Sequence, residues 1–391
     1  MELCYFDNNA TTELDQQVFQ AMLPYLRESY GNASSLQHAL GRHANQAVET
    51  ARHQVATLLH VEPKEILFTT GATESLNMAI QGITARYASK GQHIVTCQTE
   101  HHAVLSVCQA MERTKSAEVT YLPVNRAGQI DLQALREAIR PDTILVSIMA
   151  ANNETGILHP IGEIAEICQQ NDVLFLCDAT QWVGKLPLNL TDIPIDLLCL
   201  SAHKMHGPKG IGALFIRRRS KPIQVEPLLY GGQQELGQRP GTYPVHQIVG
   251  LGVAAQLAAQ DQNHSPRIRD YFEQRIREEI EEIEIHGYDT RRLPNTSNVH
   301  FKHVPASELM TKLPAIALSA GAACVSGSRA PSHVLTAMGI AETSALSSLR
   351  FSFSPRNTVE EIDIAIPKIK QAVQRIRSQS PIWQMFKEGL I

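Results

Sequence analysis

The sequence predicts an α/β protein with a large domain built on a mainly parallel sheet, followed by a smaller α+β domain. Over the first 260 residues, short runs that are apolar throughout alternate with helical patterns, as expected for strands covered on both faces. The polar stretch "DQNHSPR" at 261–267 then reads as a linker, and the pattern changes after it. A chain of 391 residues, 43% of them hydrophobic, is long enough for more than one core.

The predicted strands of the large domain are 65–70, 93–97, 143–149, 173–178, 196–201 and 213–216. Helical patterns lie between them at 75–88, 103–113, 132–139 and 161–170. This alternation predicts strand–helix–strand units and hence a parallel sheet. Ligands of such sheets bind at the carboxyl ends of the strands.

The smaller domain begins with "IRDYFEQRIREEIEEIEI" at 268–285. Ile268, Phe272, Ile276, Ile280 and Ile283 follow one another at helical spacing, and the charges between them indicate a solvated helix face. Two strands, 297–301 and 349–353, and a charged helix at 359–376 complete the domain. We therefore expect a large domain at 15–260 and a small domain formed by 1–14 and 261–391.

Composition argues against several classes of protein. The formal net charge is -4 without a basic block, which disfavours nucleic-acid binding. The amino-terminal residues lack the basic region and apolar run of a signal peptide, and no apolar stretch approaches the roughly 18 residues of a membrane span. We expect a soluble, cytoplasmic protein with no membrane contact.

The seven cysteines include no CxxC pair, so a structural zinc site is not expected. Cys97, Cys177 and Cys199 lie in apolar runs and are interpreted as small buried hydrophobic residues. Cys324 differs, because its neighbours in "SAGAACVSGS" are small and polar. This segment predicts an exposed, flexible loop carrying one thiol.

A lysine and an aspartate at predicted strand ends suggest cofactor chemistry. Lys204 follows a strand in "CLSAHKMHGPKG", and Asp178 ends another in "VLFLCDATQ". Alone, the lysine is most simply a surface residue and the aspartate a cap. Together they fit pyridoxal 5'-phosphate (PLP), which needs a Schiff-base lysine and an acid at its pyridinium nitrogen. Gln181 then has the position to donate to the phenolate oxygen of the ring.

The segment "FTTGATESLN" is a strand, a glycine turn and a helix start. Backbone N–H groups at Ala72, Thr73 and Glu74 make an anion site there, helped by the helix dipole. A plain capping arrangement at Thr73 explains the same residues.

The histidines are assigned to the cofactor rather than to a metal. His101 is a candidate for stacking on the pyridine ring and moving protons, although a histidine at a helix start needs no function. His203 and His206 have i,i+3 spacing, yet no third ligand follows at a suitable distance. No metal is expected in the site.

Two further residues are candidates for binding substrate. Asn153, in "AANNETG", follows a strand, where asparagines are common in turns. Arg350 lies within the apolar strand "SSLRFSF". A half-buried arginine either forms a structural salt bridge or clamps a substrate carboxylate.

These segments resemble the class V aminotransferase family of fold-type I PLP enzymes, and within it the cysteine desulfurases of the NifS/IscS type. The resemblance covers essentially the whole chain. The motifs that carry it are "YFDNNATT", "GNASSLQHALGR", "FTTGATES", "TEHHAV", "ANNETG", "CDATQ", "SAHKMHGPKGIGAL", "RPGTYPVHQIVG", "GAACVSGS", "LRFSFS" and "SPIWQMFKEG".

The resemblance implies a role for each candidate. Lys204, Cys324 and His101 are the catalytic residues; the cofactor is bound by Ala72, Thr73, Asn153, Asp178, Gln181, Ser201, His203, Lys204 and Thr242; the substrate is bound by Asn153 and Arg350. It also implies a homodimer in which Thr242 of one chain reaches the phosphate held by the other.

The implied activity converts L-cysteine to L-alanine and leaves a persulfide on Cys324, whose sulfur passes to an iron–sulfur scaffold or another acceptor. A selenocysteine lyase on the same scaffold is the alternative enzyme, and a catalytically silent sulfur-assembly protein is the alternative outside enzymes. The chain departs from many relatives at Ala320 and Ala322, where serine is common, and at Arg329 and Ala330. The last two bear on acceptor docking.

Overall fold

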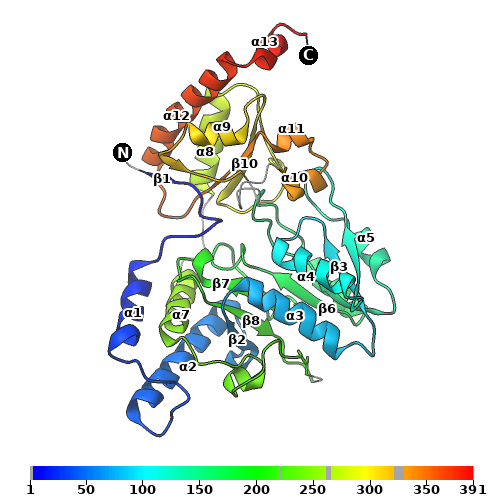
Figure 1. The fold of residues 1–391 in the computed structure, drawn as a ribbon, viewed down its shortest axis with the longest axis vertical. Coiled ribbons are helices and arrows are strands. Elements are labelled where there is room, and N and C mark those ends of the chain that lie inside the picture. Colours follow the sequence, from blue (N-terminus) through cyan, green and yellow to red (C-terminus); the bar gives the residue numbers. More distant parts are fainter. Residues whose placement is uncertain (1–2, 221, 261–265, 321–329, 391) are drawn as a thin grey trace.

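The computed structural model describes residues 3–220, 222–260, 266–320 and 330–390. Figure 1 shows two parts stacked along the long axis, with the larger sheet in the lower part and the carboxyl terminus at the upper end. The elements agree with the predicted α/β class. The domain boundaries expected after residues 14 and 260 stay a prediction.

A seven-stranded sheet forms the lower part. Its strands lie in the order β2 (Ile66–Thr69), β8 (Gly212–Ile216), β7 (Leu197–Ser201), β6 (Leu174–Asp178), β5 (Thr143–Ser147), β3 (His93–Cys97) and β4 (Glu118–Leu122). Only β8 runs antiparallel to its neighbours; the other pairs are parallel. All six predicted strands are confirmed. The edge strand β4 was not predicted, because it is partly exposed and lacks a continuous apolar run.

Helices cover both faces of this sheet, and the side chains of each strand alternate between them. On one face, Leu197 and Cys199 of β7 join the core beneath α3 (Ala72–Arg86) and α4 (His102–Arg113). On the other face, Leu198 and Leu200 join the core beneath α2 (Ala39–Leu59), α6 (Ile161–Gln170) and α7 (Val245–Gln260). This double coverage explains why the strands are apolar throughout.

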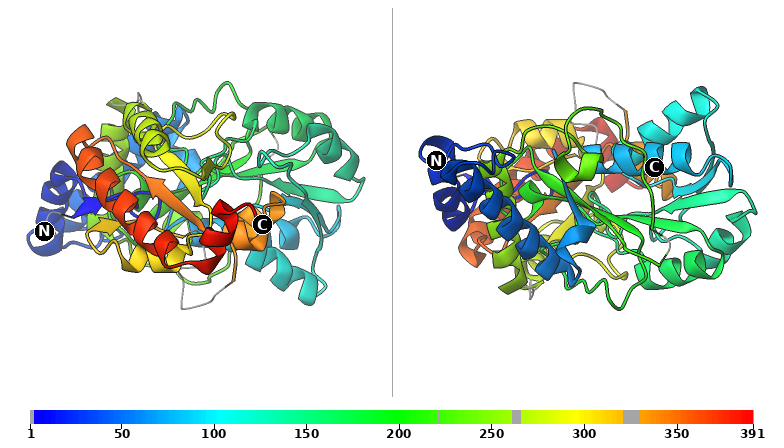
Figure 2. Two further views of the ribbon diagram at one scale, coloured as in Figure 1. Left: turned by 90° about the horizontal axis from the view of Figure 1, so that it is seen from above. Right: turned by 90° about the horizontal axis from the view of Figure 1, so that it is seen from below.

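The remaining helices of the lower part pack mainly on the helices that cover the second face of the sheet. Helix α1 (Gln16–Arg27) packs on α7, which also packs on α2, and α5 (Leu132–Ala138) packs on β4 and α6. Seen from below, the blue α1 and α2 lie at one end of the molecule and the cyan α4 at the other (Figure 2). Short 3-10 helices lie at Pro63–Glu65, Ala202–Lys204 and Gln234–Gly237.

The upper part contains a three-stranded antiparallel sheet in the order β12 (Ser348–Ser352), β10 (Thr296–Phe301) and β9 (Ile283–Ile285). Helices α8 (Arg267–Glu279), α9 (Ala306–Thr311) and α12 (Val359–Ser378) pack around it, and α13 (Pro381–Lys387) follows α12. The short α10 (His333–Ala337) and α11 (Glu342–Ala345) precede β12. The core here is aromatic, with Phe272 against Phe351 and Phe353.

One helix expectation is wrong at its end. Helix α8 stops at Glu279, Ile280 is extended, and Ile283 belongs to β9 rather than to the helix. The reason is visible in the local pattern, because "EIEI" also alternates with the period of two that suits a strand. Pairing of Ile283 with Phe301 of β10 selects the strand.

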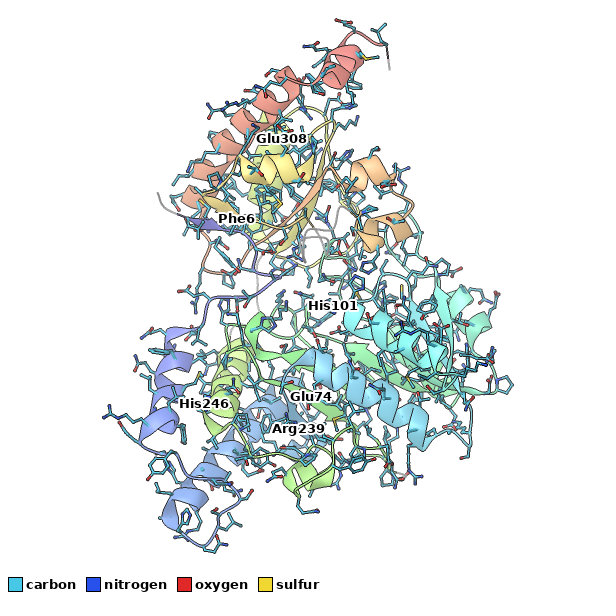
Figure 3. The ribbon with its side chains drawn as sticks, in the orientation of Figure 1. Phe6, Glu74, His101, Arg239, His246 and Glu308 are labelled. Carbon is cyan, nitrogen blue, oxygen red and sulfur yellow. The ribbon has the colours of Figure 1, made fainter. Side chains whose placement is uncertain are left out.

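The amino-terminal segment connects the two parts. Strand β1 (Cys4–Tyr5) pairs with β11 (Ile316–Ala317), and Phe6 is fully buried in the upper core, where Figure 3 labels it. A few residues later, the Thr12 N–H donates to the His203 carbonyl in the lower part. Residues 7–11 therefore run between the parts, beside the end of β7.

Candidate active site

The carboxyl ends of the parallel strands meet at one edge of the seven-stranded sheet, as the topology requires. A cavity of about 630 Å³ lies there. Ten of the predicted site residues line it: Ala72, Thr73, His101, Asn153, Asp178, Gln181, Ser201, His203, Lys204 and Arg350. The fold thus brings together side chains from segments spread over nearly 280 positions of the chain.

Lys204 ends the short helix that follows β7. Its Nζ donates to the backbone carbonyls of Asn9 at 2.6 Å and Ala10 at 2.8 Å. Burial, followed by the nearby positive charge of Arg350, lowers the pKa of Lys204 to about 8, although Asp178 and Asp7 oppose the shift. A lowered pKa makes the unprotonated, nucleophilic amine accessible near neutral pH.

Asp178 is the last residue of β6 and is buried. Its Oδ1 accepts a hydrogen bond from the Thr180 N–H at 2.9 Å, which fixes the carboxylate beside the cavity. Gln181 follows one turn later and is also buried. Its amide donates to the Asn9 carbonyl at 3.0 Å.

The predicted anion site lies at the start of α3. Gly71 caps the helix with φ +148°, and a Cβ there would come within 3.4 Å of Ser201 Oγ. Glycine therefore suits the backbone angle, which residues with a side chain rarely adopt, while the distance to Ser201 is an ordinary contact. The first-turn N–H groups of a helix have no partner within it, so Ala72 and Thr73 can donate them toward the cavity they line.

Glu74 follows these residues, but its carboxylate is held elsewhere. It pairs with Arg239 at 2.8 Å and accepts from the Thr70 N–H at 2.6 Å, and Figure 3 labels both charged residues. Burial raises its pKa, but the hydrogen bonds from Arg239 and Thr70 outweigh burial, and the pKa is lowered overall. The paired carboxylate leaves the helix start suitable for an anion.

His101 is the N-cap of α4 and lines the cavity, at the end of that helix facing the upper part (Figure 3). Its Nδ1 accepts from the Ala103 N–H at 3.1 Å. Desolvation lowers its pKa, and of its charged neighbours Asp178 opposes this shift while Lys204 supports it. The ring is therefore neutral near pH 7, with a proton on Nε2. His101 therefore caps a helix and also lines the cavity, and its role toward a cofactor ring stays a prediction.

Arg350, on β12 of the upper part, reaches the same cavity. Its guanidinium donates to Asp7 Oδ1 at 2.7 Å and to the Asn153 carbonyl at 3.0 Å. The salt-bridge interpretation therefore applies. Among the described residues, its buried Nε has no hydrogen-bond partner. Such a donor costs free energy unless something pairs with it, which leaves capacity for a ligand.

The two other predicted residues have different outcomes. Thr242 is exposed and does not line the cavity. Cys324 lies outside the described residues, as do Ala322 and Arg329. The chain leading to Cys324 does reach the site, because Ser319 lines the cavity and its hydroxyl donates to Asp7 at 3.0 Å.

Sequence reasoning missed three residues: Asp7, which holds Arg350; Asn9, whose carbonyl meets Lys204; and Lys185, which is buried beside Gln181. The first two belong to "YFDNNATT", and its run of polar residues directly after an apolar pair was the available signal. Lys185, in a glycine-containing turn, gave no signal.

The described cysteines do not line the cavity, although the Sγ of Cys199 donates to Asp178 Oδ1 at 3.4 Å. The six described cysteines are all buried, and none of these six forms a disulfide. Burial raises the pKa of Cys97 and of Cys108 to about 12, so these thiols are unreactive. Within the described ranges, no three histidine, cysteine or acidic side chains gather as a metal site would require. Nor does any helix there have both the length and the apolar character to cross a bilayer.

Comparison with known proteins identifies the family. The aminotransferase class-V family model matches residues 4–364. The chain belongs to this family. Curated relatives include the cysteine desulfurases IscS of Neisseria meningitidis serogroup A, 46% identical over 390 residues, and of Colwellia psychrerythraea, 45% identical over 392. Each alignment covers 99% of this chain and 96% of the relative.

Solved structures agree with this membership. A NifS-like protein superposes with a TM-score of 0.88 at 36% identity, covering 95% of this chain and 99% of the other. SspA in complex with cysteine superposes with a TM-score of 0.81 at 37% identity, covering 91% and 100%. The predicted class V fold, with its mostly parallel central sheet, is confirmed.

Proposed function

We propose that this class V aminotransferase family member is a PLP-dependent cysteine desulfurase, which converts L-cysteine to L-alanine and supplies sulfur for iron–sulfur cluster assembly. The observation that carries the proposal is that Lys204 and Asp178 line the same cavity. An amine whose pKa is lowered to about 8 faces the same space as a buried carboxylate. The names of the curated relatives support this activity.

The residues of the cavity fit PLP group by group. Lys204 supplies the amine for the Schiff base, and Asp178 the acid for the pyridinium nitrogen. The helix start at Ala72 and Thr73 offers backbone N–H groups, which suit the phosphate. Ser201 and His203 line the same cavity and carry further polar groups. Burial lowers the pKa of His203 to about 4, so this ring binds in its neutral form. When bound, PLP supplies the electron sink that stabilises charge at the substrate Cα.

The chain's own residues then bind L-cysteine and move its protons. Arg350 binds the carboxylate, using the buried Nε that has no partner within the described part of the chain. Asn153 lies beside it, with its carbonyl held by Arg350. Lys204, once released by the substrate amine, takes the proton from Cα. His101, neutral and protonated on Nε2, can donate a hydrogen bond from that nitrogen to the substrate.

Sulfur transfer requires Cys324. Its thiolate bonds to the substrate sulfur, the carbon–sulfur bond breaks with its electron pair left on carbon, and protonation there gives alanine. Cys324 is left as a persulfide. Ser319, five positions earlier in the chain, lines the cavity, so the segment bearing Cys324 starts at the site.

Assembly and partners follow from the same family. We propose a homodimer in which Thr242, exposed in the single chain, contributes to the phosphate site of its partner. The sulfur acceptor is an iron–sulfur scaffold or another thiol-bearing protein. We place the reaction in the cytoplasm.

A colour test decides the cofactor. The purified protein with added PLP is expected to be yellow, and Lys204→Ala to lose the visible band. Lys90→Ala is the matched control, because Lys90 is an exposed lysine paired with Asp172. It should keep the band. A colourless wild-type protein at saturating PLP would refute the proposed cofactor.

A further inference from the structure

Lys185 is a completely buried lysine whose amine has no acidic partner among the described residues. It follows Gln181 by four positions and does not line the cavity. A buried amine is costly unless its N–H groups are used. Lys185 uses them on two side-chain oxygens, both belonging to residues that do line the cavity.

The first of these oxygens is Gln181 Oε1, at 2.5 Å from Nζ. The other end of the same amide, Nε2, donates to the Asn9 backbone carbonyl at 3.0 Å. Because a carbonyl only accepts, the nitrogen of Gln181 must face Asn9 and the oxygen must face Lys185. The amide therefore has one orientation, with its remaining N–H available on the nitrogen side.

The second oxygen is Asn9 Oδ1, at 2.9 Å from Lys185 Nζ. The Asn9 amide is held at its nitrogen as well, which donates to the Asn153 carbonyl at 3.1 Å. The Asn9 backbone carbonyl in turn accepts from Lys204 Nζ at 2.6 Å. Lys185 thus donates to Gln181 itself and to Asn9, whose backbone carbonyl accepts from both Gln181 and Lys204.

The charge state of Lys185 does not alter this role. Burial, and after it the positive charges of Lys204 and Arg350, lower the pKa of Lys185 well below that of an exposed lysine. A neutral amine still has two N–H groups, one for each oxygen. An ammonium group has three.

We propose that Lys185 is a positioning residue that fixes the Gln181 amide with its N–H toward the ligand cavity, so that Gln181 acts as a hydrogen-bond donor to an anionic oxygen of the bound cofactor. This inference rests on the proposed function, since that oxygen is the phenolate of PLP. Lys185 itself touches neither cofactor nor substrate; it acts through Gln181.

The test measures the pH at which the Lys204-bound PLP changes its absorption spectrum. A donor to the phenolate oxygen stabilises the deprotonated linkage, so losing it raises the midpoint. Lys185→Met is expected to raise the midpoint by about one pH unit, the size of one hydrogen bond to a charged oxygen. Gln181→Leu is expected to give a similar rise.

The double variant distinguishes positioning from simple charge removal. In a Gln181→Leu background, Lys185→Met should leave the midpoint where Gln181→Leu put it, because a residue acting through Gln181 has nothing further to lose. A full, additive rise in that background would overturn the proposal and assign the effect to the charge of Lys185. An unchanged midpoint in the Lys185→Met single variant would overturn it as well.

If Lys185→Met fails to fold, Lys185→Gln replaces it. Glutamine is one atom shorter and cannot reach both oxygens, so the same rise is expected. Failure of both variants to fold would overturn the proposal by assigning Lys185 to stability alone. Failure of the proposed function looks different, because the wild-type protein would then bind no PLP and show no spectrum to titrate.

Discussion

Replacing Arg350 with alanine separates a substrate clamp from a structural salt bridge. Arg350 donates to Asp7 at 2.7 Å and to the Asn153 carbonyl at 3.0 Å, and its Nε has no partner in the described part of the chain. If Nε and its neighbours bind the carboxylate of L-cysteine, Arg350→Ala removes charge-assisted hydrogen bonds of about 1.5–3 kcal/mol. That corresponds to roughly a 10- to 150-fold loss of cysteine affinity.

The same substitution also breaks the ion pair. The side chain of Arg350 is 6% exposed and that of Asp7 is 18% exposed. Removing one partner of a buried pair costs about 3–5 kcal/mol. We expect the lower end, about 3 kcal/mol, because Asp7 keeps its hydrogen bond from Ser319 and some contact with water. The variant should therefore fold, with a lower melting temperature.

Asp7→Asn is the matched control, since it weakens the ion pair and leaves the guanidinium in place. The assay compares the Kd for PLP, followed by absorbance, with the KM for L-cysteine. Arg350→Ala should raise KM far more than the PLP Kd, and Asp7→Asn should raise KM only slightly. Equal losses for cysteine and PLP in Arg350→Ala, or an equal loss of cysteine affinity in Asp7→Asn, would show that Arg350 is structural only.

Three further outcomes are expected. Cys324→Ala should keep the visible PLP band and lose sulfur release from L-cysteine; desulfuration at the wild-type rate would remove Cys324 from the reaction. Burying the Lys204 amine should lower the free energy of unfolding of the apoprotein by an amount that depends on pH, because its folded-state pKa of about 8 lies below that of a free lysine. This destabilisation is full below pH 8 and disappears toward the ordinary lysine pKa of about 10.4. The melting temperature of Lys204→Met should accordingly exceed that of the wild type at pH 7 and approach it at pH 10, and a constant difference would contradict the shift. Phe272→Ala should destabilise the protein by about 3–5 kcal/mol, because Phe272 is fully buried against Phe351 and Phe353; a loss under 1 kcal/mol in a denaturant titration would mean that this aromatic core repacks.

The strands of the large sheet were predictable because burial on both faces gives each strand a continuous apolar run that can be seen without knowing its neighbours. Residues 197–200 are apolar whichever face each one joins, and the structure places β7 at Leu197–Ser201. The edge strand β4 has partly exposed side chains and therefore lacks such a run. Ile283 shows a different limit, because a spacing of three or four residues fits a helix and local alternation fits a strand. Pairing with β10 decided between them.

The sequence predicted which residues line the candidate site, but only some of the contacts between them. Lys204 and Asp178 stand at strand ends, and parallel strands bring their carboxyl ends to one edge. The sequence did not identify the partner of Arg350, because an arginine within an apolar strand fits both a structural salt bridge and a substrate clamp. The structure shows that Asp7 is its salt-bridge partner. The contacts of Lys185 with Asn9 and Gln181 depend on a turn and on a segment 176 positions away, which no local pattern encodes.

The sequence by itself determined the class of fold, the strands that end at the candidate site and the family, because strand periodicity and ordered motifs are local properties of the chain. Only the tertiary structure decided which donors and acceptors meet. The amino-terminal segment crosses between the two parts and places the Asn9 carbonyl on Lys204 and Asp7 on Arg350. Those contacts orient the polar groups around the cavity, and they depend on distances between residues far apart in the chain.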